Sequence, residues 1–186
     1  DYGVVNVDIA WGGMFFVLAD ANQFNIDPNA KNGAAIVKAS EAMRHAAALQ
    51  YPVTHPENPN ITGPTISALN ASPTDPETHG RGAITVSSGA FIPGKVSGAL
   101  DRSPCGTGTC AKMAVLHAKG LLNIGEDYVN AGPLGTTFTG NIVQTTKIGP
   151  YDAIIPTLSG RAWISGISQY LLDPTDPFPT GFTVGD

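Results

Sequence analysis

Strand-like patterns of hydrophobic residues open the chain. Residues 2–10 and 14–19 predict two strands, joined by a hairpin-like turn at Trp11-Gly12-Gly13, where the glycines permit a positive φ. Residues 51–80 predict polar turns, a rigid loop at HPENPN and a single strand near 65–70. Further β-branched or alternating segments predict strands at 83–88, 137–147, 151–157 and 161–169.

Two segments have helical patterns of different kinds. Residues 34–49 predict a helix with a single apolar stripe, formed by Ile36, Ala39, Met43, Ala46 and Ala47. Residues 109–122 are apolar almost all round, with only Lys112 and Lys119 on a narrow strip and Gly120 as a stop signal, so this helix is expected to be buried. We therefore predict an α+β fold, with a mixed, largely antiparallel sheet curled around this central buried helix.

Composition narrows the range of functions. The 186 residues carry a net charge of −5 with 13% charged residues, and the basic residues are scattered, so neither nucleic acid nor a membrane is an expected partner. No apolar run is long enough for a spanning helix. The four histidines show no metal-binding spacing, so no metal site is predicted. Cys105 and Cys110 are placed too rigidly to bridge, which indicates a reducing compartment, and a cytoplasmic location is expected.

The segment DRSPCGTGT, residues 101–109, concentrates the candidate chemistry. Pro104 fixes the approach to Cys105, and the glycines that follow let the backbone come close to a ligand, while Thr107 or Thr109 caps the helix. Free N–H groups at a helix start favour a carboxylate or phosphate and lower the pKa of a neighbouring thiol. The Asp101 carboxylate adds a group that holds an ammonium. The segment thus has complementary contacts for both ends of an amino acid.

Other interpretations of the same residues stay open at this point. A glycine-rich turn before a helix is often only a turn, and Cys105 and Cys110 both fit small buried hydrophobic residues. A phosphate loop is disfavoured because Ala111 stands where the second glycine of that pattern precedes its lysine. A cysteine hydrolase needs a histidine base, and no motif singles one out.

A longer stretch, DRSPCGTGTCAKMAVLHAKGLL, is similar to the second active-site motif of the proline racemase family. Four further segments resemble that family in its order: VDIAWGGMFF, HPENP, GTTFTG and IPTLSGRAWISG. The resemblance covers nearly the whole chain and implies a fold of the diaminopimelate epimerase-like kind. It also implies a racemase or epimerase that needs no cofactor and acts on proline or a hydroxyproline.

The resemblance further implies two cysteines on opposite sides of the substrate's α-carbon, one removing the proton and the other returning it. Cys105 matches one of the pair. Asp101 matches the residue that contacts the ring nitrogen, and the backbone N–H groups of Gly106 and Thr107 match those that bind the carboxylate. Dehydratase relatives typically have Thr at the position of Cys105, so racemisation or epimerisation is expected.

The second cysteine of the family belongs to a Cys-Gly-His-like motif in its first domain, and this sequence has no such motif. We therefore expect residues 1–170 to be the second domain of a two-domain racemase and 171–186 to be a return segment or tail. The missing N-terminal domain is an expected partner, a homodimer is left open, and this half alone is expected to be inactive. The alternatives are a 3-hydroxyproline dehydratase, a broader amino-acid racemase, or a non-catalytic ligand-binding fragment.

Overall fold

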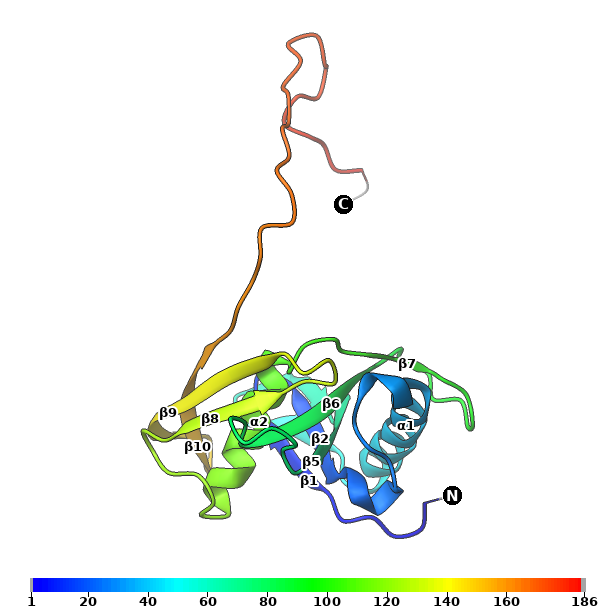
Figure 1. Cartoon of the computed structure of the whole chain (residues 1–186). Coiled ribbons are helices and arrows are strands. Elements are labelled where there is room, and N and C mark those ends of the chain that lie inside the picture. Colours follow the sequence, from blue (N-terminus) through cyan, green and yellow to red (C-terminus); the bar gives the residue numbers. More distant parts are fainter. Residues whose placement is uncertain (1, 185–186) are drawn as a thin grey trace.

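A curled, mixed sheet dominates the computed structural model, which describes residues 2–184 (Figure 1). Its strand order is β1-β2-β5-β6-β8-β9-β10, with β7 beside β6. Two pairs, β2/β5 and β6/β8, are parallel, and the others are antiparallel, which confirms the largely antiparallel sheet. The strands are β1 (Asp8–Trp11), β2 (Phe15–Asp20), β5 (Ile66–Ala71), β6 (Gly80–Ser87), β7 (Gly98–Leu100), β8 (Asp127–Ala131), β9 (Thr137–Ile148) and β10 (Tyr151–Ser159).

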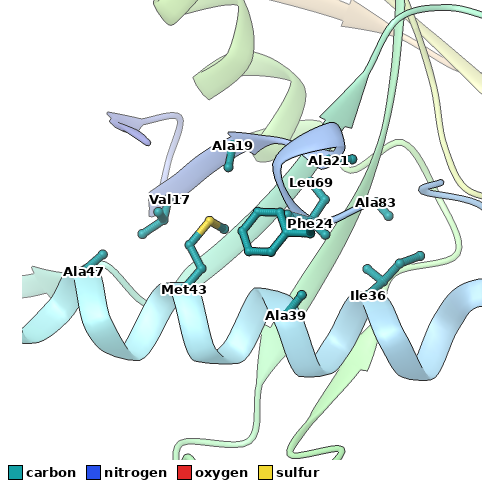
Figure 2. Packing of buried hydrophobic residues seen from close by; sticks show 10 residues of the cluster. All are labelled: Val17, Ala19, Ala21, Phe24, Ile36, Ala39, Met43, Ala47, Leu69 and Ala83. Carbon is teal, nitrogen blue, oxygen red and sulfur yellow. The ribbon is translucent and has the colours of Figure 1, made fainter. Parts of the chain in front are cut away.

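Helix α1 (Gly33–Gln50) covers one face of the sheet and confirms the helix expected at 34–49. Figure 2 shows its small and flexible side chains against the strands, with Phe24 of the short 3-10 helix η1 (Ala21–Phe24) packed between them. The alanines allow the helix backbone to approach the sheet closely. Ala46 is the exception in the predicted stripe, because it is exposed. A second 3-10 helix, η2 (Ala30–Asn32), leads into α1.

Helix α2 (Gly106–Ala118) lies on the other face, so β2 is buried on both sides. Val17 and Ala19 pack in the cluster with α1, whereas Phe16 and Leu18 pack in the cluster with Ala111 of α2. This alternation follows from the period of two along a strand. Strand β2 therefore joins the two apolar clusters into one folded unit.

The central helix differs in two ways from the prediction over 109–122. It begins three residues earlier, and its surface is only partly covered: Met113 is fully buried, whereas Ala118 is exposed. Lys112, placed by the pattern on an exposed strip, is half-buried instead. The stop signal is confirmed, since Gly120 has φ 70° and its N–H donates to the His117 carbonyl at 2.9 Å, which closes the helix end.

Other boundaries also changed. The first strand begins at Asp8 rather than at residue 2, and the expected loop around HPENPN is the turn of a hairpin formed by β3 (Val53–His55) and β4 (Asn58–Gly63). Strands β7 and β8 were not predicted. The strand expected at 161–169 is wrong, because this segment pairs with no strand among residues 2–184 and leaves the body as an exposed extension (Figure 1).

The division into a domain over 1–170 and a tail over 171–186 stays a prediction, and residues 1, 185 and 186 lie outside the described residues. The last strand of the folded body ends at Ser159. Beyond it, large apolar side chains are exposed, among them Trp163, Ile164 and Ile167. Among the helices of residues 2–184, none combines the length and the apolar character needed to cross a membrane.

Candidate functional site

Cys105 stands at the N-cap of α2 in an uncommon backbone conformation, with φ 62° and ψ 122°. A non-glycine residue with positive φ is strained by about 1–3 kcal/mol and persists only where its surroundings hold it. The Cys105 Sγ accepts a hydrogen bond from the Gly108 N–H at 3.4 Å and lies 3.6 Å from the Thr107 hydroxyl. The expectation that Thr107 or Thr109 caps the helix is therefore wrong, because the thiol itself is the cap.

A short series of hydrogen bonds ties Asp101 to Cys105. The Cys105 N–H donates to the Ser103 hydroxyl at 3.0 Å, and the Ser103 N–H donates to the Asp101 carboxylate at 2.9 Å. The Asp101 N–H in turn donates to the Ile84 carbonyl of β6 at 2.8 Å. Ser103 was not singled out from the sequence, although a serine two residues after an aspartate is a recognisable turn signal.

Two backbone amides at the start of α2 point away from the helix without an acceptor. Within residues 2–184, neither Gly106 nor Thr107 finds a hydrogen-bond acceptor for its N–H, as expected for the first turn of a helix. Such groups bind anions, and the helix dipole adds to the attraction. The thiol, a carboxylate and a potential anion site thus adjoin one another, as the sequence indicated.

The pKa of Cys105 changes in the direction opposite to the one expected. Burial raises the pKa of the thiol, and this outweighs the Gly108 N–H and the Thr107 hydroxyl, both of which lower it. The nearby Asp101 carboxylate raises it further, since a second negative charge is disfavoured beside the first. The effect of burial on the thiol's pKa therefore outweighs that of the helix start.

Cys110 is half-buried, which corrects its assignment to the core. Both cysteines are free thiols, as predicted. Burial also raises the pKa of the Cys110 thiol, and the charge of Cys105 contributes in the same direction. Cys110 is thus a second thiol close to the first, with no hydrogen bond to it.

Two other motifs of the sequence meet near α2. Gly12, in the turn after β1, lies so close to the helix that a Cβ atom there would be 2.1 Å from the Thr107 carbonyl oxygen. The neighbouring Trp11 ring lies 4.8 Å from the His55 ring, which connects the turn to the β3–β4 hairpin. The turn after β1 therefore packs directly against the start of α2. The hairpin that contains the HPENP motif packs in turn against Trp11 of that turn.

An apolar-walled cavity lies further along α2, away from Cys105. It has a volume of about 490 Å³ and is bounded by β1, the β3–β4 hairpin, the second half of α2 and β10. Trp11, His55 and Val115 contribute to its wall, whereas Cys105 and Asp101 do not. Cys105 and Asp101 therefore lie outside this cavity, and together they form one wall of the candidate site.

The fold is a curled α+β sheet with a central helix that is capped by a thiol. Comparisons with known proteins identify a family of the class that this fold and site indicate. The proline racemase family model matches residues 1–183, and the chain belongs to this family. The chain is 38% identical over 180 residues to the 4-hydroxyproline 2-epimerase of Streptosporangium roseum, and 34% identical over 180 residues to the proline racemase of Clostridioides difficile. Each alignment covers 97% of this chain but 51% of the relative, so the chain spans about half the length of these curated relatives.

Solved structures agree with this assignment and confirm the fold expected from the resemblance. The chain superposes on a probable proline racemase from Agrobacterium radiobacter, with bound carbonate, with a TM-score of 0.78 and 33% identity. A hydroxyproline epimerase from Agrobacterium vitis, with bound trans-4-hydroxy-L-proline, gives a TM-score of 0.77 and 32% identity. The matches cover 98% of this chain and 51% and 50% of those chains, respectively.

Proposed function

We propose that this chain is one half of a cofactor-independent racemase or epimerase acting at the α-carbon of proline or a hydroxyproline. The carrying observation is the half-buried thiol of Cys105 beside the unpaired amides of Gly106 and Thr107. The names of the similar proteins support the reaction class and the substrates. In the proposal, Cys105 and a cysteine of the missing half face the α-carbon from opposite sides.

The role of each group follows from its chemistry. The substrate carboxylate accepts hydrogen bonds from the Gly106 and Thr107 amides, and Asp101 holds the ring nitrogen. One thiolate takes the α-proton, and the opposite thiol gives its own proton to the other face, so the two sulfurs exchange protonation states in each turnover. Burial favours the neutral thiol at Cys105, and this suits it to donate the proton for one enantiomer.

The missing N-terminal domain is the partner that this proposal requires. With one sulfur only, a proton can be removed and returned on the same face, which exchanges hydrogen without inverting the centre. A second wall also excludes water and strengthens every electrostatic interaction with the carbanion-like transition state. The two free thiols fit the reducing cytoplasm that we propose as its location.

The test measures deuterium incorporation at the α-carbon of L-proline and of trans-4-hydroxy-L-proline in D₂O. The full-length protein is expected to form the inverted product labelled with deuterium, whereas its Cys105→Ser variant loses inversion. Cys110→Ser is the matched control and retains it. Full turnover by Cys105→Ser would refute the role of Cys105, and a cyclic imine from 3-hydroxyproline would identify a dehydratase instead.

A companion measurement uses the 186-residue chain alone. It is expected to bind either amino acid weakly and to produce no inverted product. Racemisation by this chain alone would contradict the requirement for a second wall.

A further inference from the structure

Two buried polar residues form a hydrogen-bonded connection between β8 and the turn that carries Cys105. The Asn130 side-chain amide donates to the Thr109 hydroxyl oxygen at 3.0 Å. The Thr109 hydroxyl donates to the carbonyl of Pro104 at 3.2 Å. Thr109 is completely buried and Asn130 is 4% exposed, so water does not compete for these bonds.

The direction of this connection is fixed by hydrogen count. Thr109 has a single hydroxyl proton, which goes to the Pro104 carbonyl, so its oxygen accepts from Asn130. The Asn130 amide oxygen is then buried without a partner among residues 2–184. An unpaired buried acceptor costs about 1–3 kcal/mol, so this side chain stabilises the fold less than an apolar residue of its size.

The backbone just after β8 also packs closely against the same turn. Gly132 is the first residue after β8 and stands two residues beyond Asn130. A Cβ atom at Gly132 would lie 2.8 Å from both the Ser103 carbonyl carbon and the Pro104 nitrogen. The segment before Cys105 is thus held at two points. The peptide between Ser103 and Pro104 packs against the backbone of Gly132, and the Pro104 carbonyl accepts a hydrogen bond from Thr109.

We propose that Thr109 and Asn130 are positioning residues that hold the Pro104 carbonyl and thereby keep Cys105 in its positive-φ conformation. This conformation places Sγ at the Gly108 N–H. Without the hydrogen bonds of Asn130 and Thr109, Cys105 relaxes towards an ordinary backbone conformation. Its Sγ then loses the hydrogen bond from the Gly108 N–H, and this hydrogen bond favours the thiolate. The inference rests on the proposed role of Cys105 and adds two residues that lie outside the wall itself.

The test is the pH profile of alkylation by iodoacetamide in the 186-residue chain, with Cys105 and Cys110 quantified separately by mass spectrometry. Thr109→Val keeps the shape and removes the hydroxyl, Thr109→Ser keeps the hydroxyl, and Asn130→Leu removes the amide. The Val and Leu variants are expected to raise the Cys105 midpoint by roughly 0.5–1 pH unit, the value of one hydrogen bond. Thr109→Ser restores the wild-type midpoint, and Cys110 does not move.

A double variant checks that the two residues act as one unit. Thr109→Val with Asn130→Leu is expected to shift the midpoint no further than either change alone, because both interrupt the same connection. An unchanged Cys105 midpoint in Asn130→Leu, equal shifts in the Ser and Val variants, or an equal shift at Cys110 would each overturn the inference. If Thr109→Val does not fold, Asn130→Leu decides.

Failure of this inference can be told apart from failure of the proposed function. An unmoved Cys105 midpoint with inversion lost in full-length Cys105→Ser removes the positioning role only. A shifted midpoint with inversion retained in Cys105→Ser removes the proposed function and leaves the connection in place.

Discussion

Replacing Lys112 with methionine is expected to stabilise the chain at neutral pH. The Lys112 ammonium lies 3.4 Å from the Arg81 carbonyl oxygen and 5.6 Å from the centroid of the Tyr128 ring. Burial lowers the pKa of Lys112 to about 8. The Asp20 carboxylate acts in the opposite direction and raises this pKa, but its effect is smaller. A charge held in this position is therefore poorly compensated.

The size of the effect follows from the displaced pKa. A change from 10.5 to about 8 corresponds to about 3 kcal/mol of unfavourable charge burial. The hydrogen bond to the Arg81 carbonyl and the contact with the Tyr128 ring offset about 1 kcal/mol of this cost. Lys112→Met should therefore raise the free energy of unfolding by roughly 1–2 kcal/mol at pH 7. Between pH 8 and 10.5 the unfolded chain binds the proton more tightly than the folded chain, so this penalty in the wild type disappears as pH rises.

Urea unfolding followed by circular dichroism, at pH 7 and at pH 10.5, measures both quantities. The advantage of Lys112→Met should be present at pH 7 and absent at pH 10.5. Lys38→Met is the matched control, since Lys38 is exposed on α1, and its effect should stay within about 0.5 kcal/mol. A less stable Lys112→Met at pH 7, or a difference independent of pH, would refute the reasoning.

Three further outcomes are expected. Glu41→Ala removes the fully buried carboxylate that pairs with the partly buried Arg44, and it should lower the free energy of urea unfolding by about 3–5 kcal/mol. A loss of less than about 1 kcal/mol, typical of exposed pairs, would contradict this expectation. Gly12→Ala forces a methyl group onto the Thr107 carbonyl and should destabilise by about 1–3 kcal/mol in the same assay, whereas Gly166→Ala, in open space, should not. Because burial raises the Cys105 pKa, alkylation of this thiol should have a higher pH midpoint in the folded chain than in urea, and a lower one would exclude that cause.

Local patterns predicted those parts of the fold whose structure depends on their own residues. Helix α1 was found within one residue at each end, because its apolar stripe and its stop signal are both local. Strands β3 and β4 were missed, because polar residues and prolines give a hairpin no periodic pattern. The segment 161–169 has a strand-like pattern, but a strand needs a neighbouring edge, and none adjoins it within residues 2–184.

The candidate site shows the same division. Its location at residues 101–109 could be read from the order of an aspartate, a proline, a cysteine and two glycines, because turn residues and a helix start are specified locally. Ser103 had a local signal that was overlooked, whereas Asn130 had none, since it reaches Thr109 from a strand that is 21 residues away in sequence.

Residue order alone was enough to place a thiol, a carboxylate and free amides at the start of one helix, because these groups lie within a few residues of one another. The tertiary structure decided the backbone conformation of Cys105 and the direction in which its pKa is shifted. Cys105 has its positive φ beside the hydrogen bond from Thr109 to Pro104 and the close approach of Gly132, and burial raises its pKa. Burial and long-range contacts are properties of the folded chain, so no local pattern in the sequence contains them.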